Sequence, residues 1–189
     1  MTTKTDRAVQ IAAACLVLLV MIVLLRAQGR LVLCACGYFD VWTSDTCSSN
    51  NSQQLFDPYS FTHVLHGFLF FWVIALLFRR LTAAWQLWLA LFLESVWEVF
   101  ENTSFVIDKY RTETAALGYT GDTVVNSLGD VACALAGFLV ARRFGLRRSL
   151  IVFLLLELVL ILWIHDSLLL QIVMLVRPVE AIKLWQMCR

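Results

Sequence analysis

The sequence predicts an all-α membrane protein, a polytopic helical bundle with five transmembrane helices and a short interfacial or re-entrant helix at its C-terminal end. Of its 189 residues, 60% are hydrophobic and only 15% are charged, and the mean hydropathy is +0.77; ordinary soluble domains are about 25% charged. Apolar runs long enough for membrane helices alternate with short segments that contain arginine. Because no repeat or low-complexity tract is present, residues 1–189 are expected to form a single integral membrane domain.

The first three predicted helices are apolar runs with basic residues near their ends. The first covers residues 8–25, where 18 residues carry no charge. This run is longer than a signal-peptide core and no cleavage pattern closes it, so we expect an uncleaved signal anchor. The second covers residues 60–78 and is followed by Arg79 and Arg80, and the third covers residues 82–102.

The fourth and fifth predicted helices cover residues 122–141 and 149–164 and are joined by an arginine-rich segment. The last apolar run, residues 168–176, is too short to cross about 30 Å of hydrocarbon at 1.5 Å per residue. After Arg177 and Pro178, charged residues are spaced among apolar ones. This pattern is typical of a helix that lies at the membrane interface or re-enters it.

The basic residues also predict an orientation. Arg79, Arg80 and the arginines between residues 142 and 148 fall on the same side of an alternating bundle as the amino terminus. Since short cytoplasmic loops are rich in Lys and Arg, we expect that side to be cytoplasmic. The longer segments 26–59 and 103–121 then lie outside, where we expect the functional surface.

Three of the predicted helices carry polar side chains near the end that faces outward. They are His63 and His66 in the second helix, Glu94, Glu98 and Glu101 in the third, and Asp122, Asn126 and Asp130 in the fourth. Within each helix the spacing of three or four residues places these side chains on one face. A charge near the centre of a membrane helix costs about 2.5 to 3.5 kcal/mol, so we expect the three faces to meet one another rather than lipid.

Two interpretations of this set stay open at the level of sequence. Ionisable residues inside a membrane mark functional sites by default, and on that reading the candidate catalytic residues are Glu98, Asp122, Asp130, Glu101 and Asn126. On the structural reading the same groups pair with one another, or with Lys109 and Arg111, and hold the helices together.

The chemistry of a functional site has two versions. His63 and His66, with Glu98 and Asp130, offer the imidazole and carboxylate ligands that suit a divalent metal such as zinc, manganese or iron, although no HExxH motif is present. Without a metal, closely placed acids in a dry site supply a general acid beside a general base. The sequence does not separate the two versions.

Other residues receive simpler interpretations. Glu157 lies alone in the fifth predicted helix and is expected to face the bundle with a hydrogen-bond partner. In the first outer segment, an oxidising compartment permits a disulfide bridge from Cys47 to either Cys34 or Cys36.

Several motifs together resemble a family of small bacterial multi-pass membrane proteins that is classed only as a domain of unknown function. They include Asp57-Pro-Tyr-Ser-Phe-Thr-His63-Val-Leu-His66-Gly67 and Gly121-Asp122-Thr-Val-Val-Asn126-Ser127. The resemblance covers nearly everything after Gly29 and implies a bacterial inner-membrane protein. Gln54 departs from it, because a histidine usually follows Ser-Gln in the family pattern. More loosely, the third and fourth helices are similar to VanZ-like membrane proteins, which are associated with resistance to glycopeptide antibiotics.

Two functions from different classes follow. The first is a membrane-embedded hydrolase or transferase that acts on a lipid or lipid-linked envelope precursor near the outer leaflet. The second is a non-catalytic ion or proton carrier, or an assembly partner, in which the same cluster is a conduit or a helix-packing network. The lipid bilayer is the expected partner in both. Nucleic acid is not, since the formal net charge of +1 leaves no basic excess.

Overall fold

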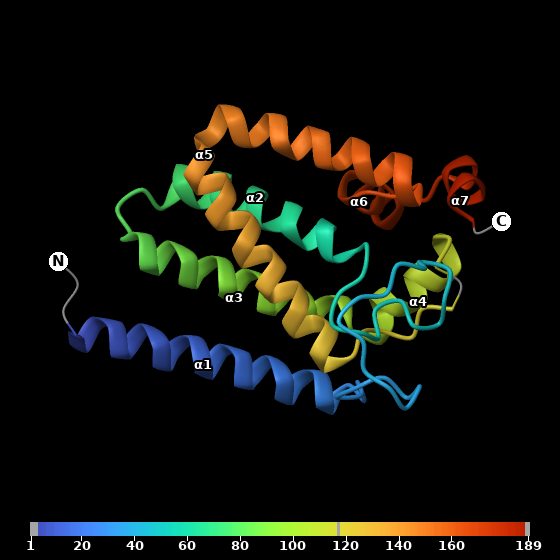
Figure 1. The fold of residues 1–189 in the computed structure, drawn as a ribbon, viewed down its shortest axis with the longest axis horizontal. Helices are drawn as coiled ribbons and strands as arrows, with labels where there is room; N and C mark the ends of the chain where they lie inside the picture. Colours follow the sequence, from blue (N-terminus) through green and yellow to red (C-terminus); the bar gives the residue numbers. More distant parts are fainter. Residues whose placement is uncertain (1–3, 117, 188–189) are drawn as a thin grey trace.

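The computed structural model describes residues 4–116 and 118–187, and within these ranges it contains seven helices and no strand (Figure 1). The all-α class predicted from the sequence is therefore confirmed. The helices are α1 Lys4–Ala27, α2 Ser60–Leu77, α3 Ala83–Glu101, α4 Ser104–Glu113, α5 Val124–Ile164, α6 Leu168–Val176 and α7 Glu180–Gln186.

Local sequence explains where several of these helices begin. A threonine or serine directly precedes α3, α4, α5 and α6, and its side-chain oxygen accepts a hydrogen bond from a backbone N–H in the first turn. Such caps satisfy one of the N–H groups that a helix leaves without an internal partner. The capping residues are Thr82, Thr103, Thr123 and Ser167.

The backbones of α2 and α5 touch at two glycines. A Cβ atom added to Gly67 would lie 2.0 Å from the carbonyl oxygen of Ala134, and one added to Gly137 would lie 2.0 Å from that of Val64. Small residues permit this close approach between helices. The contact fixes the polar face of α2 against that of α5, because Gly67 directly follows His66 in the sequence.

The long helix α5 is two helical arms joined at Gly145, whose φ of 73° and ψ of 171° are not helical. The chain turns sharply there (Figure 1). The arms, residues 124–144 and 146–164, are about 31 and 28 Å long at 1.5 Å per residue. The sequence predicted two helices separated by a loop, but a single glycine in the left-handed region of φ turns the chain without one.

Two described helices are long and apolar enough to cross a membrane, α1 over Thr5–Ala27 and α2. A third crossing is added if α5 and α6, which are bent by 76° at their junction, count as one broken span. Helix α3, which carries three glutamates, is not one of these candidates, and α5 enters only together with α6. The apolar helices are consistent with a membrane protein, and the count of five crossings stays a prediction.

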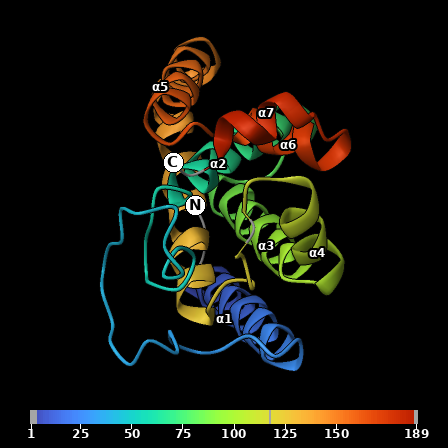
Figure 2. The same cartoon turned by 90° about the vertical axis from the view of Figure 1, so that its right-hand side faces the viewer.

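The structure departs from the sequence-based prediction in three further places. The segment 103–121 contains a helix, α4, that its polar composition did not reveal, and the C-terminal region contains two short helices, α6 and α7, instead of one. Cys34 forms a disulfide with Cys36, so the expected bridge from Cys47 to one of them is wrong. The helices α4, α6 and α7 all lie at the end of the bundle that faces the viewer in Figure 2.

Candidate functional site

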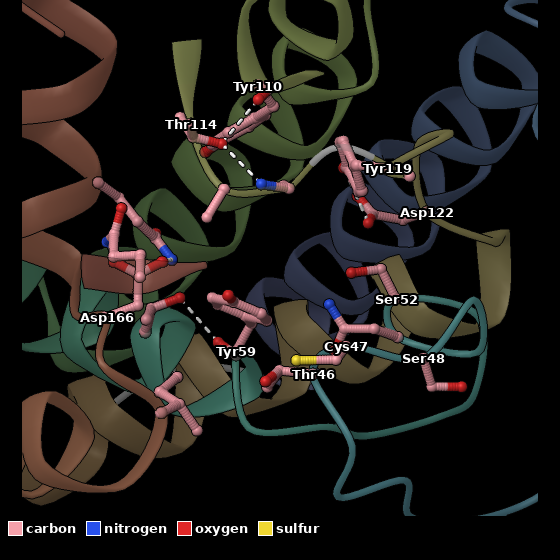
Figure 3. Close-up of a pocket in the computed structure, with 18 of the residues that line it drawn as sticks. Thr46, Cys47, Ser48, Ser52, Tyr59, Tyr110, Thr114, Tyr119, Asp122 and Asp166 are labelled. Atoms are coloured by element: carbon pink, nitrogen blue, oxygen red, sulfur yellow. Dashed lines mark hydrogen bonds between the residues drawn. The ribbon is translucent and has the colours of Figure 1, made fainter. Parts of the chain in front are cut away.

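A cavity of about 450 Å³ lies at the end of the bundle where α2 begins and α3 ends (Figure 3). Every described helix except α1 contributes to its wall, together with the segments 46–52 and 114–122. The wall contains hydroxyl and acidic side chains, but no lysine or arginine among the residues that the structure describes. Its ionisable nitrogen and oxygen groups belong to Tyr59, His63, Glu101, Tyr110, Tyr119, Asp122, Asp130 and Asp166.

His63 joins this wall to a second group of side chains buried behind it. Its Nδ1 atom lies 2.6 Å from Oε1 of Glu94 and 3.3 Å from Oε1 of Glu98, two α3 carboxylates that are 0% exposed. Its Nε2 atom lies 3.9 Å from Oδ2 of Asp130 in α5. One imidazole therefore contacts carboxylates of two different helices.

A second histidine faces the same buried carboxylate. Nδ1 of His66 lies 3.1 Å from Oε2 of Glu94, and the rings of His63 and His66 are 5.0 Å apart between centroids. The Trp97 indole packs against the His66 ring in a T-shaped contact. Two ring nitrogens thus contact the Glu94 carboxylate, because residues three apart on α2 face the same point on α3.

Not every polar atom of this group has a partner. Both carboxylate oxygens of Glu98 are buried without a hydrogen bond, and so are Oδ1 of Asp130 and the side-chain nitrogen of Asn126. Buried polar atoms without partners are rare in folded proteins and call for an explanation, such as an ion or water at the site.

The polar side chains in the outer part of the wall have hydrogen-bond partners. Asp122 accepts one from the side-chain nitrogen of Asn102 at 2.7 Å and one from the hydroxyl of Tyr119 at 2.9 Å (Figure 3). The hydroxyl of Tyr110 donates to Glu101 at 3.0 Å. Burial, together with the nearby acids, raises the pKa of both tyrosines well above 10, so both hydroxyls stay protonated and donate.

A further acid, Asp166, closes the opposite side of the cavity. It follows α5 and accepts hydrogen bonds from the side-chain nitrogens of Gln186 at 2.8 Å and Gln171 at 3.4 Å. The hydroxyl of Tyr59 also donates to it (Figure 3). Burial raises the pKa of Asp166 to about 7, although these hydrogen bonds act to lower it.

The structure thus brings together four of the predicted site residues, His63, His66, Glu98 and Asp130, and adds Glu94 at their centre. Glu101 and Asp122 lie in the outer wall of the same cavity, whereas Asn126 is buried and outside the cavity lining. The sequence placed Glu94 on the correct helix face but gave it no role. Asn102, Tyr59, Tyr119 and Asp166 were missed, because isolated polar residues in short connecting segments carry no periodic pattern.

The sequence left open that Lys109 and Arg111 pair with the acidic cluster and hold the helices together, but the described contacts do not support this pairing. Lys109 pairs with Glu113 at 3.2 Å, and Arg111 donates to the backbone oxygen of Tyr119. Glu157 has the hydrogen-bond partner that was expected, since its carboxylate accepts from the backbone N–H of Leu169 at the start of α6. Gln54 is buried within the segment 26–59, where it accepts a hydrogen bond from the backbone of Asp40.

Comparison with known proteins gives matches over most of the chain. The family described as "Protein of unknown function (DUF2585)" matches residues 25–188. A UPF0314 protein of Agrobacterium fabrum is 43% identical over 169 residues, which cover 89% of this chain and 85% of that protein. UPF0314 proteins of Novosphingobium aromaticivorans and Rhizobium meliloti are each 41% identical, over 96% and 97% of this chain and 93% of each relative. No solved structure matches the chain, and the similarity to VanZ-like proteins stays a prediction.

Proposed function

We propose, from the premise that the chain belongs to the DUF2585 family of proteins of unknown function, that it is an inner-membrane enzyme. In this proposal it is a hydrolase or transferase that acts on the head group of a lipid or lipid-linked envelope precursor. The observation that carries the proposal is the cavity of about 450 Å³ whose wall contains His63 and Asp130. A concave site with a few convergent ionisable groups is the usual form of a small-molecule site.

The depth of these groups fits a lipid substrate in the outer leaflet. We propose five crossings, formed by α1, α2, α3 and the two arms of α5, with the amino terminus in the cytoplasm and the cavity on the outer side. Counted at 1.5 Å per residue from the nearest helix end, His63, Glu94 and Asp130 then lie about 5 to 10 Å below the outer surface. The polar head of a bilayer lipid reaches this level.

The charge of the wall narrows the substrate class. Four carboxylates, those of Glu101, Asp122, Asp130 and Asp166, face the cavity without a lysine or arginine among the described lining residues. Carboxylates accept hydrogen bonds from hydroxyl and amine groups and repel anions. The reacting part of the substrate is therefore a sugar, a polyol or an amine-bearing head group in preference to a bare phosphate.

The chemistry we propose is general acid–base catalysis at the boundary between the cavity and the buried group. Asp130 holds or accepts the proton of the attacking water or hydroxyl group, since one of its carboxylate oxygens has no hydrogen-bond partner. Its other oxygen faces Nε2 of His63 at 3.9 Å, beyond hydrogen-bond distance, and the carboxyl group has a side-chain hydrogen bond with Ser60. Both oxygens of Asp122 already accept hydrogen bonds, which hold this carboxylate in a fixed orientation. We therefore assign Asp122 the role of positioning the substrate.

A carrier function is less well supported by the packing below Asp130. Between Asp130 and the bend at Gly145, the buried residues of α5 are all apolar or glycine: Val131, Ala134, Gly137, Phe138 and Ala141. The carboxyl group of Asp130 therefore has no polar continuation along this helix toward the opposite end of the bundle. A conduit for protons or ions needs such a continuation.

The test is a comparison of membrane lipids and envelope precursors in a bacterium whose own copy has been deleted and replaced by variants of this chain. We expect a lipid or precursor to change in amount on deletion, the wild type to restore it, and Asp130→Asn to fail at equal protein abundance. Glu157→Gln is the matched control, because Glu157 is another buried acid of α5 but binds the start of α6 outside the cavity. Unchanged lipids and precursors on deletion, or full complementation by Asp130→Asn, would refute the proposal.

A further inference from the structure

We infer that the buried group behind the cavity is a binding site for one divalent transition-metal ion, held by His63, His66, Glu94 and Glu98. The inference rests on the proposed function only for the chemical role of the metal, which would lie directly behind His63 in the cavity wall. Binding itself is a separate property and can be measured without any knowledge of the substrate.

The first observation is that potential ligand atoms converge. One ring nitrogen each of His63 and His66 and one oxygen of Glu94 all lie within 4.8 Å of one another, and His63 makes a similar group with Glu98 and Glu101. Ligands about 2.1 Å from a tetrahedral metal lie about 3.4 Å apart. The distances of 3.1 Å from His66 to Glu94 and 3.3 Å from His63 to Glu98 are close to this spacing.

The second observation is independent of that convergence and concerns Glu98. Its side chain is 0% exposed, points toward Nδ1 of His63, and has no hydrogen bond on either oxygen. The two imidazoles already point at Glu94, so a purely structural ion-pair network leaves the Glu98 carboxylate without a hydrogen-bond donor. A cation between Glu94 and Glu98 supplies that missing partner, because buried charges in proteins are paired or bind metals.

The third observation is the surroundings of the ligands. The second ring nitrogen of His63 faces Oδ2 of Asp130 at 3.9 Å. Metal-binding histidines in many proteins direct this nitrogen to a carboxylate, although here the distance is longer than a hydrogen bond. Trp97 packs against the ring of His66 in a T-shaped contact, with ring centroids 5.3 Å apart. Imidazole and carboxylate ligands together suit Zn²⁺, Mn²⁺ and Fe²⁺.

The experiment uses the full chain, purified in detergent without a histidine tag and treated with a chelator. Equilibrium dialysis against Zn²⁺ and, separately, Mn²⁺ is followed by elemental analysis of the protein. Mn²⁺ is included because it avoids thiols, and the described part of the chain contains free thiols at Cys15 and Cys133. We expect about one metal ion per chain and a rise in melting temperature on binding.

Single substitutions then locate the site. Glu98→Gln and His66→Gln should each weaken binding at least tenfold, since loss of a second-shell partner alone weakens metal sites about 10- to 100-fold. Glu157→Gln should bind like the wild type and controls for the loss of a buried acid. Circular dichroism confirms that each variant is folded before it is counted.

The results distinguish this inference from the proposed function. Absence of stoichiometric binding, or binding that Glu98→Gln and His66→Gln leave unchanged, would overturn the metal site while the lipid comparison still stands. Stoichiometric binding that both substitutions weaken, in a protein whose deletion leaves lipids and precursors unchanged, would support the metal site and refute the enzyme.

Discussion

Nδ1 of His63 lies 2.6 Å from the carboxylate of Glu94, in a buried contact that joins α2 to α3. The next turn of α3 carries Glu98, which is buried to the same extent but lacks hydrogen bonds. Two glutamates four residues apart on one helix thus differ in the metal-free protein: Glu94 already contacts two imidazoles, whereas Glu98 has no hydrogen-bond partner.

Glu94→Gln is expected to destabilise the protein by about 1 to 3 kcal/mol, because it weakens a hydrogen-bonded partner of two buried imidazoles. Glu98→Gln is expected to leave the stability of the metal-free protein unchanged or to raise it, since it removes a buried charge without hydrogen bonds. Melting temperatures of the two purified variants check this. Equal destabilisation by both substitutions would mean that Glu98 also serves the packing of the helices.

The prediction for Asp166 concerns pH. Because burial raises its pKa from 3.8 to about 7, the folded protein binds more protons than the unfolded chain between about pH 4 and pH 7. The contribution of Asp166 to stability is therefore present below about pH 4 and is lost as the pH rises through 7. In Asp166→Asn the fall in melting temperature over this range should be smaller than in the wild type. Parallel pH profiles for the two proteins would show that Asp166 does not titrate in this range.

The contact between α2 and α5 predicts that two glycine-to-alanine substitutions differ in their effect on stability. Gly137→Ala places a Cβ atom 2.0 Å from the carbonyl oxygen of Val64, and the helices must separate at a cost of about 1 to 3 kcal/mol. Gly118→Ala is the control, since nothing lies within 4 Å of its added Cβ atom. Thermal unfolding should show a lower melting temperature for the first variant only.

The proposed topology is tested by cysteine labelling in a cysteine-free background. Ser44→Cys and Asp108→Cys, at exposed positions of the two outer segments, should react with a membrane-impermeant maleimide added to intact spheroplasts. Arg80→Cys, at an exposed position between α2 and α3, should react only after the membrane is opened. The reverse pattern would place the cavity on the cytoplasmic side.

The sequence predicted those parts of the fold that depend on local pattern. Apolar runs and arginine stops located α1, α2, α3 and both arms of α5, because each of these helices is apolar enough to be recognised alone. In the same way, the helical repeat predicted that Glu94 and Glu98 share one face of α3. The three helices that were missed or merged, α4, α6 and α7, are short and owe their position to contacts with distant residues, such as the bond from Lys183 to the backbone of Thr112.

The candidate site was predictable to a similar degree and for the same reason. The helical spacing and the expected depth in the membrane grouped His63, His66, Glu98 and Asp130. Which of their atoms have hydrogen-bond partners depends on side-chain directions, and spacing alone does not give these. Asp166 lies outside any periodic run, and its role emerges only when Gln186, twenty residues later, folds back onto it.

The bend at Gly145 also determines where the chain tolerates a change of length. Phe68 of α2 belongs to one hydrophobic cluster with Ala141 of the first arm and with Phe153 and Leu160 of the second. Because a helix advances about 100° per residue, one residue inserted between the arms would rotate the second arm, together with the start of α6 that Glu157 binds, away from α2. A one-residue insertion at the bend is therefore expected to break this shared cluster, although it changes no side chain that lines the cavity.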